Sequence, residues 1–221
     1  MKCCVLVPIY NEIETIGMVV ESVLGKGLDV VVIDDGSTDG SGENARGRGA
    51  VVLSNDVRSG KGAALRRGFV YAIEKNYEGV ITMDGDGQHD AKDIDKIIKA
   101  AEADPCSIVN GTRMTQVQDM PLLRRVTNRV MSWMISVVCK QRIPDTQCGF
   151  RYISADILRR IKLESSGYEI ETEVLIKASY LKYPVYSVPV RTIYSIEKSN
   201  IDPVKDTIRF FKFFLKAIIY R

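Results

Sequence analysis

Five short apolar runs, rich in β-branched residues, recur along the first half of the chain and constrain its fold more than any other feature. Between most of them lie segments whose apolar residues repeat at helical spacing. Alternating strands and helices form a mainly parallel, doubly wound sheet that helices cover on both faces. We therefore expect an α/β fold. The predicted strands are residues 3–8, 28–35, 50–55, 79–84 and 106–113.

The segments between these strands carry helix signals. Asn11 is expected to cap the first helix, with Glu14 completing a capping box and Gly25 near its end. Helical spacing predicts two further helices, over residues 62–75 and 93–103. Their apolar faces would cover the sheet.

The second half contains two amphipathic segments, residues 121–140 and residues 203–221. The second surrounds its basic residues with four phenylalanines. Both have the composition of a helix that lies in the plane of a membrane surface. The alternative for each is an apolar face packed on the domain or on a second subunit. The polar stripe of the first segment consists of Arg125, Arg129, Ser132, Ser136 and Lys140.

The composition argues against several classes of protein. A chain of 221 residues can form one large domain, or one domain with an appendage. Its 31 basic and 28 acidic residues leave a net charge of +3, too small to indicate a nucleic-acid partner. Five cysteines without a CxxC pair predict neither disulfides nor a zinc site, and hence a reducing, cytoplasmic compartment. No apolar stretch reaches about 18 to 20 residues, so any membrane contact is expected to be peripheral.

Polar groups follow three of the predicted strands: PIYNE, DDGSTDGS and DGDGQHD. In parallel sheets, ligands bind beyond the carboxyl ends of the strands, so we expect all three segments to line one crevice. Asp35 is the predicted ligand of a sugar or base, whereas Thr38 and Asp39 read as turn formers. His89 is the only histidine, which argues against imidazole-based triads. Lys61 lies in a segment without the P-loop pattern.

Asp84 and Asp86 flank a single glycine, and Gln88 follows two residues later. Two carboxylates this close repel each other unless a cation lies between them. Oxygen ligands suit Mg²⁺ or Mn²⁺, so these three residues form a predicted metal site. The alternative is an acidic turn.

Six segments occur in an order that is typical of a known family. Together they resemble the family 2 glycosyltransferases of the dolichyl-phosphate or polyprenyl-phosphate sugar synthase type, over residues 5–198. The resemblance implies a GT-A fold and the transfer, with inversion, of a sugar from a UDP- or GDP-sugar donor to a lipid phosphate. The segments are VPIYNE, VIDDGSTDGS, GKGAALRRGF, DGDGQHD, DTQCGFR and YEIETEVLIKA.

The resemblance also assigns residues to the donor. Arg113 and Lys198 would contact its diphosphate, with Arg191 as a further candidate. The positions matched to the base and ribose are Pro8, Tyr10, Glu12, Ile33 and Asp35. The positions matched to the metal and diphosphate are Asp84, Gly85, Asp86 and Gln88.

For the acceptor, the resemblance places Arg113 beside the lipid phosphate, and Arg125 and Arg129 are expected to hold that phosphate from the helix. Glu171, with Glu173 as the second position, matches the catalytic carboxylate of relatives that act on hydroxyls. A lipid phosphate arrives ionised, so a base is optional, and positioning and charge neutralisation would supply most of the rate. Asp145 is an alternative carboxylate, expected to orient an acceptor-site arginine such as Arg151. The residues expected to be catalytic are Asp86, Arg113, Arg129 and Glu171.

In domain terms, residues 1–113 would bind the nucleotide-sugar and residues 114–200 the acceptor, completing one GT-A domain. Residues 201–221 would form a C-terminal amphipathic helix. The protein is expected at the cytoplasmic face of a membrane, attached peripherally, with a homo-oligomer or a membrane-protein partner as further possibilities.

Three other functions are compatible with parts of the pattern. One is transfer to a soluble or polysaccharide hydroxyl, with Glu171 as the required base. Another is a non-catalytic subunit that binds a nucleotide-sugar, which the intact acids argue against. A phosphatase is disfavoured, because its nucleophile loop would follow the first strand, which here ends in PIYNE.

Overall fold

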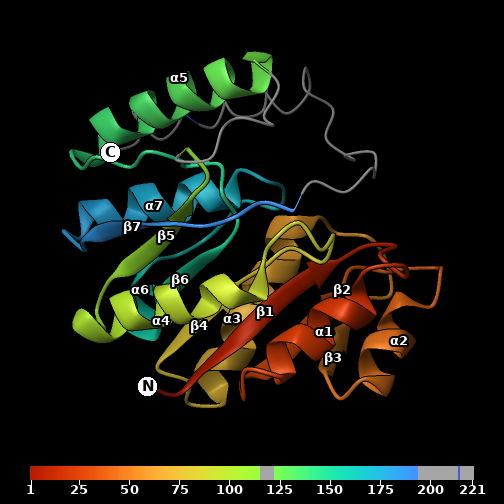
Figure 1. Cartoon of the computed structure of the whole chain (residues 1–221). Helices are drawn as coiled ribbons and strands as arrows, with labels where there is room; N and C mark the ends of the chain where they lie inside the picture. Colours follow the sequence, from red (N-terminus) through yellow and green to blue (C-terminus); the bar gives the residue numbers. More distant parts are fainter. Residues whose placement is uncertain (115–121, 194–213, 215–221) are drawn as a thin grey trace.

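The computed structural model describes residues 1–114, 122–193 and 214, and within them it contains a seven-stranded sheet of order β3-β2-β1-β4-β6-β5-β7 (Figure 1). All strand pairs are parallel except those of β6, which runs antiparallel to β4 and β5. The α/β class and the five predicted strands are therefore confirmed. The strands are β1 Cys3–Ile9, β2 Asp29–Asp34, β3 Val51–Ser54, β4 Gly79–Thr82, β5 Ile108–Thr112, β6 Arg151–Ser154 and β7 Val185–Pro189.

Helices cover both faces of the sheet. One buried cluster packs α1, α2 and α4 against it, and the other packs α3, α5, α6 and α7 against the opposite face. Cys3 and Cys4 lie in different clusters, because neighbouring strand residues point to opposite faces. The helices are α1 Ile16–Leu24, α2 Ser41–Gly47, α3 Lys61–Glu74, η1 Ala91–Asp93, α4 Ile94–Ala103, α5 Leu122–Cys139, α6 Ala155–Arg160 and α7 Ile170–Tyr180.

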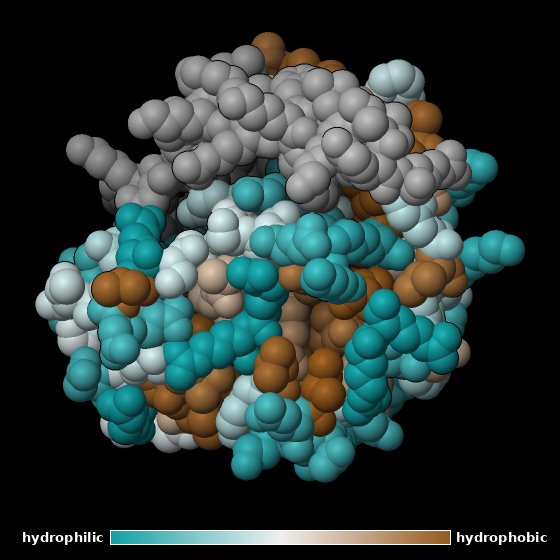
Figure 2. Space-filling view, turned by 180° about the vertical axis from the view of Figure 1, so that it is seen from behind, coloured by the Kyte–Doolittle hydropathy of each residue, from teal (hydrophilic) through white to brown (hydrophobic). Residues whose placement is uncertain are grey.

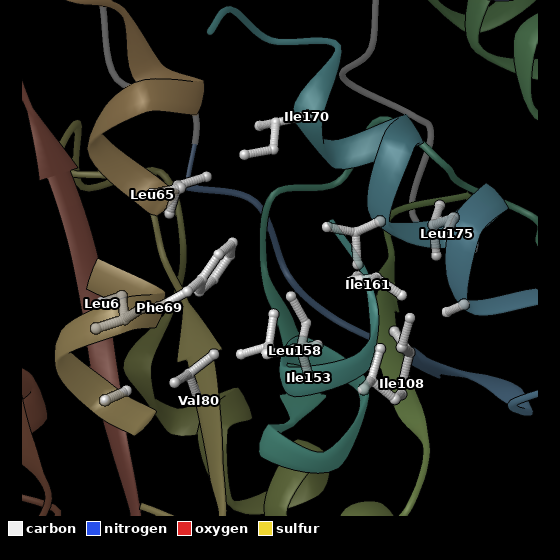
Figure 3. Close-up of a cluster of buried hydrophobic side chains, with 14 of the residues drawn as sticks. Leu6, Leu65, Phe69, Val80, Ile108, Ile153, Leu158, Ile161, Ile170 and Leu175 are labelled. Atoms are coloured by element: carbon white, nitrogen blue, oxygen red, sulfur yellow. The ribbon is translucent and has the colours of Figure 1, made fainter. Parts of the chain in front are cut away.

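Figure 3 shows the cluster between the sheet and α3, α6 and α7. Leu65 and Phe69 of α3 point toward the strands, and Leu158 of α6 and Leu175 of α7 extend the same layer. Phe214, the one described residue of the last segment, is also buried in this cluster. The rest of the predicted C-terminal helix lies outside the described residues.

The start of α1 differs from the prediction. The helix begins at Ile16, with Thr15 at the N-cap position, so Asn11 and Glu14 do not form the expected capping box. Asn11 instead has a left-handed backbone with φ of 57°. Its side-chain oxygen accepts a hydrogen bond from the Thr38 N–H at 2.9 Å, which joins the loop after β1 to the loop after β2. The tertiary bond thus replaces the local cap.

Helix α5 confirms the predicted helix, but its polar residues do not all lie on one exposed face. Ser132 and Ser136, two residues of the predicted polar stripe, point inward and bond to Thr146 and Ile143. No described helix is both long and apolar enough to cross a bilayer. The face opposite to that in Figure 1 mixes polar and apolar side chains over much of its area (Figure 2). The large apolar residues that α5 exposes are Leu122, Val126, Val130, Trp133 and Val137.

Candidate active site

The loops after β1, β2 and β4 meet at the carboxyl edge of the sheet, as predicted. The Glu12 N–H donates to Ser41 Oγ at 2.8 Å, which links the first loop to the second. Thr15 Oγ1 donates to the Gly85 carbonyl oxygen at 2.7 Å, which links the first loop to the third. Hydrogen bonds between loops that are distant in sequence fix the three segments around one site.

Four charged residues form what we call the acid cluster: Asp84, Asp86, Glu171 and Lys61. Lys61 Nζ lies 2.6 Å from Asp84 Oδ1 and 2.6 Å from Glu171 Oε1, so one ammonium bridges two carboxylates. Asp86 Oδ1 accepts from the Gln88 N–H at 3.0 Å. Lys61 is the first residue of α3, and Glu171 belongs to α7, so the cluster joins strand and helix ends from both halves of the chain.

The two predicted metal ligands differ in electrostatics. Burial alone would raise the pKa of Asp84, but the adjacent Lys61 ammonium holds it at about 2. Burial raises the pKa of Asp86, and the charge of Asp84 raises it further. Burial would lower the pKa of Lys61, but the two carboxylates keep it above its usual value. The described residues contain no group of three or more His, Cys, Asp or Glu side chains arranged to hold a metal.

Gly149 leaves room for the acid cluster. A Cβ there would lie 2.9 Å from Asp84 Oδ2 and 3.0 Å from Glu171 Oε1, closer than ordinary contacts allow. Any side chain at Gly149 would push the carboxylates apart. The glycine of the DTQCGFR segment is therefore needed for their spacing.

His89 borders the loop that carries Asp84 and Asp86. Its Nδ1 accepts the Asp84 N–H at 3.2 Å, and its ring stacks on Phe150 with centroids 5.1 Å apart. Burial lowers the pKa of His89 despite its acidic neighbours. The neutral imidazole thus holds the backbone that carries Asp84.

Asp35 organises a loop. One of its carboxylate oxygens accepts from Asn55 Nδ2 at 2.8 Å and the Ser59 N–H at 2.9 Å, and the other accepts from the Gly60 N–H at 2.7 Å. These bonds fix the segment that leads into Lys61. In the same segment the guanidinium of Arg58 lies over the ring of Tyr10, 3.9 Å from its centroid.

The other residues predicted to bind the donor are placed unequally. Pro8 and Glu12 are partly exposed beside the site. Ile33 is fully buried, and its side chain packs against Gly68 of α3. The expectation for Ile33 is therefore corrected: its side chain belongs to the core, because α3 covers the face of β2 to which it points.

Arg113 and Asp145 form a buried pair. Arg113 Nε and Nη2 donate to the two oxygens of Asp145 at 2.8 and 3.0 Å, and the Arg113 N–H adds a third bond at 3.1 Å. Burial would raise the pKa of Asp145, but Arg113 holds it below its usual value. Asp145 thus orients Arg113, which is itself one of the predicted acceptor-site arginines, and not Arg151, the example that the sequence suggested.

Arg151 is a core residue. It is 1% exposed and donates to the carbonyl oxygens of Cys148 and Glu171 at 2.6 and 2.7 Å. Its Nη2 also lies 3.6 Å from Glu171 Oε2. Glu173 also has a structural role, since its carboxylate accepts hydrogen bonds from the backbone N–H groups of Glu164 and Ser165. Glu171 is the carboxylate of the two that reaches the site.

The predicted acceptor arginines lie on α5. Arg129 is exposed, and Arg125 is half-buried with an Nε that has no hydrogen-bond partner among the described residues. Arg129 lines an open groove of about 530 Å³ together with Trp133 and Lys140. One turn further along, Ser132 bonds to Thr146, the neighbour of Asp145, so α5 and Arg113 share one supporting loop.

The segment after β7 runs past the loop that follows β4. The Ile193 N–H donates to the Gln88 carbonyl oxygen at 2.9 Å, and the Arg191 N–H donates to Asp93 Oδ2 at 2.6 Å. The side chain of Arg191 is exposed. Lys198 lies outside the described residues.

Sequence reasoning understated two site residues. The absence of a P-loop pattern left Lys61 without a predicted role, and no sequence pattern singled out Arg58. The signal for Lys61 was the glycine on each side of it. A Cβ at Gly60 would lie 2.4 Å from the Ser166 carbonyl oxygen, and one at Gly62 would lie 2.6 Å from that of Ser165.

Comparison with known proteins then decides the family. The family model described as Glycosyl transferase family 2 matches residues 4–162. The chain belongs to this family. It is a glycosyltransferase with a GT-A-like fold, as the sequence indicated.

Its relatives include enzymes named for lipid phosphates. An undecaprenyl-phosphate mannosyltransferase of Micrococcus luteus is 29% identical over 205 residues, covering 86% of this chain and 83% of that protein. A UDP-N-acetylglucosamine–dolichyl-phosphate N-acetylglucosaminyltransferase of Methanococcus voltae is 28% identical over 213 residues, covering 86% and 85%. Among solved structures, glucosyl-3-phosphoglycerate synthase from Mycobacterium tuberculosis, in complex with Mn²⁺, UDP and phosphoglyceric acid, has a TM-score of 0.74 at 19% identity. That match covers 99% of this chain and 78% of that one, and it supports the fold.

Proposed function

We propose that the chain transfers a sugar, with inversion, from a UDP- or GDP-sugar to a polyprenyl or dolichyl phosphate. Its family and its relatives named for lipid phosphates support this reaction. The observation that carries the choice of acceptor is the pair of cation contacts made by Glu171, the residue that the family resemblance matches to a catalytic base.

Glu171 is held by cations on both sides. Its Oε1 lies 2.6 Å from Lys61 Nζ, and its Oε2 lies 3.6 Å from Arg151 Nη2. A general base must be able to reach and accept a proton, and these contacts compete for both oxygens. A phosphate acceptor is already ionised and needs no base. Glu171 therefore favours a phosphate over a hydroxyl as the nucleophile.

The residues at the end of β4 suit a divalent cation. Asp84, Asp86 and Gln88 offer oxygen ligands, which Mg²⁺ and Mn²⁺ prefer. Asp86 has a raised pKa and forms no ion pair among the described residues, so a cation would relieve its repulsion from Asp84. When bound, such an ion neutralises the charge that develops on a departing diphosphate.

The remaining roles follow from position. Tyr10 and Arg58 would contact the base, and Pro8, Glu12 and Asp35 would shape the base and ribose pocket. Arg113, kept in place by Asp145, would contact the donor diphosphate and the acceptor phosphate. Arg191 and Lys198 stay candidates for the diphosphate.

Helix α5 would bring the enzyme to its lipid. Leu122, Trp133 and Val137 are 74%, 67% and 59% exposed, and Val126 and Val130 continue the same face. Arg129 and Lys140 line the adjacent groove. An apolar stripe beside cations is the pattern of a helix that binds the surface of an anionic membrane. We place the protein peripherally at the cytoplasmic face.

The decisive experiment measures transfer from radiolabelled UDP- and GDP-sugars to short polyprenyl phosphates, with Mg²⁺ or Mn²⁺ and with EDTA. Metal-dependent lipid-linked product from one donor is the expected result. Transfer only to an added hydroxyl acceptor would replace the proposal with the hydroxyl reaction. Binding of a nucleotide-sugar without any transfer would support the non-catalytic reading.

An acceptor-site variant sharpens that assay. Arg129→Ala should lower kcat/KM for the lipid phosphate by roughly 100-fold, since a charge-assisted contact at a phosphate contributes about 1.5–3 kcal/mol. Arg160→Ala is the matched control, because Arg160 pairs with Asp156 on the surface of α6. Equal activity of the two variants would remove Arg129 from the acceptor site.

Membrane binding has its own readout, because Trp133 is the only tryptophan in the chain. Its fluorescence should shift to shorter wavelength with vesicles containing anionic lipid, and Trp133→Glu should weaken co-sedimentation with those vesicles. Trp133→Phe is the conservative control. An unchanged emission spectrum would show that α5 does not meet the bilayer.

A further inference from the structure

The ammonium of Lys61 lies beside Asp84, where a bound metal ion would also lie. Its Nζ lies 2.6 Å from both Asp84 Oδ1 and Glu171 Oε1, and 5.4 Å from the centroid of the Tyr168 ring. Its side chain is only 16% exposed. One predicted metal ligand is therefore already paired with a cation supplied by the protein.

We propose that Lys61 is a built-in counter-ion that makes binding of a divalent cation at the acid cluster depend on a nucleoside diphosphate. This inference rests on the metal site of the proposed function, and it makes Lys61 a positioning residue for metal and donor together.

The first step of the argument is competition. A divalent cation that approaches Asp84 meets an ammonium already bound to the same carboxylate, and the two positive charges repel each other. Glu171 offsets only part of this repulsion, because its Oε1 is bound to the same ammonium. Lys61 thus weakens the affinity of the acid cluster for a free cation.

The second step is that Lys61 is anchored. The Gly62 N–H donates to the Ser166 carbonyl oxygen at 2.8 Å, and neither Gly60 nor Gly62 has room for a Cβ against residues 165–167. The start of α3 is thus pressed onto the segment before α7. The backbone cannot carry the ammonium away when a cation arrives.

The third step is the effect of the diphosphate. A nucleoside diphosphate adds negative charge that attracts both the ammonium and the divalent cation. The repulsion between the two cations is then offset by their shared anion. Metal and nucleotide should bind with strong positive coupling, and by linkage each should raise the affinity of the other by the same factor.

The test measures the affinity for Mn²⁺ directly, by electron paramagnetic resonance of free Mn²⁺, without nucleotide, with UDP and with GDP. The variants are Lys61→Met, which removes the charge, and Lys61→Arg, which keeps it. Lys26→Met is the matched control, because it removes a lysine paired with Asp95 away from the site.

We expect Lys61→Met to bind free Mn²⁺ at least ~10-fold more tightly than the wild type, because one cation no longer repels another. In Lys61→Met, the factor by which UDP or GDP, whichever has the larger effect, raises the affinity for Mn²⁺ should fall by a similar amount. Lys61→Arg and Lys26→Met should keep the coupling of the wild type. Free Mn²⁺ affinity that is unchanged or weaker in a folded Lys61→Met variant would overturn the inference.

If Lys61→Met does not fold, Glu171→Gln answers the same question from the other side. It leaves Lys61 to pair with Asp84 alone, so free Mn²⁺ should bind more weakly while the nucleotide still promotes binding. Tighter binding of free Mn²⁺ by this variant would contradict the role of Lys61.

The sugar-transfer assay separates this inference from the proposed function. Transfer by the wild type without any Mn²⁺ effect of Lys61→Met would leave the function standing and overturn the inference. The expected Mn²⁺ effect without transfer to any polyprenyl phosphate would leave the inference standing and overturn the proposed function.

Discussion

Two groups of buried charges in this protein differ in how completely they are neutralised. Arg113 and Asp145 form a closed pair, with side chains 9% and 0% exposed. The acid cluster is open, with 16% of Lys61, 29% of Asp84 and 13% of Glu171 exposed. The first is buried in the protein, and the second faces the crevice.

The hydrogen bonds show the same contrast. Asp145 accepts three bonds from Arg113 and one from the Gln147 N–H, so its charge is fully compensated. In the acid cluster, Lys61 compensates Asp84 and Glu171 but leaves Asp86 with a raised pKa. Uncompensated charge in a crevice indicates where a ligand belongs, whereas a compensated pair indicates a scaffold.

The largest effect should follow from Asp86→Ala. Loss of a metal ligand should lower sugar transfer by at least ~1,000-fold, since a bound metal contributes several kcal/mol to the reaction. The thermal midpoint in EDTA should stay equal or rise, because the fold disfavours the ionised form of Asp86. A fall in both activity and stability would mean that the acid cluster is a scaffold as well.

Asp145→Asn, unlike Asp86→Ala, should lower the stability of the fold. Removing the charge leaves Arg113 buried without its carboxylate, which costs about 3–5 kcal/mol of unfolding free energy. Urea denaturation measures the change, with Asp95→Asn of the surface pair with Lys26 as a control expected to cost at most about 1 kcal/mol. Equal stability of both variants would show that the Arg113 pair is not structural.

The difference in unfolding free energy between wild type and Asp145→Asn should also depend on pH in a predictable direction. Arg113 lowers the folded-state pKa of Asp145 below its usual 3.8, so the pair contributes fully to stability above that value. The contribution is lost as the pH falls through the lower folded-state pKa. The gap between wild type and Asp145→Asn should therefore be constant from pH 7 to 5 and shrink below 3.8. A gap that grows in acid would contradict this assignment.

The smallest effect should come from Glu171→Gln. With an ionised acceptor, the change should lower kcat by less than ~10-fold, because no proton is removed in the reaction. Single-turnover transfer to a polyprenyl phosphate measures it. A loss of ~1,000-fold or more, with normal donor binding, would make Glu171 a base and would favour the hydroxyl acceptor.

Much of this organisation is predictable from sequence because its signals are local. A β-branched run followed by acids marks a strand and its carboxyl end, so the five strands and the shared crevice could be predicted. Short antiparallel β6 escaped prediction, because Arg151–Ser154 has no apolar run of its own. The predicted cap at Asn11 was wrong although its signal is also local. Asparagine suits both a helix cap and the left-handed turn that Asn11 occupies, so residue type alone does not separate the two.

By itself, the sequence determined the α/β class, the family and the acids at the end of β4, since these depend on residue type and spacing along the chain. Only the tertiary structure decided that Lys61 bridges Asp84 and Glu171, that Asp145 holds Arg113, and that α5 turns its serines inward. Each of these is a contact between elements that lie far apart in sequence. The energy of burying a charge or a hydroxyl depends on the partner that packing supplies, and local pattern carries no record of that partner.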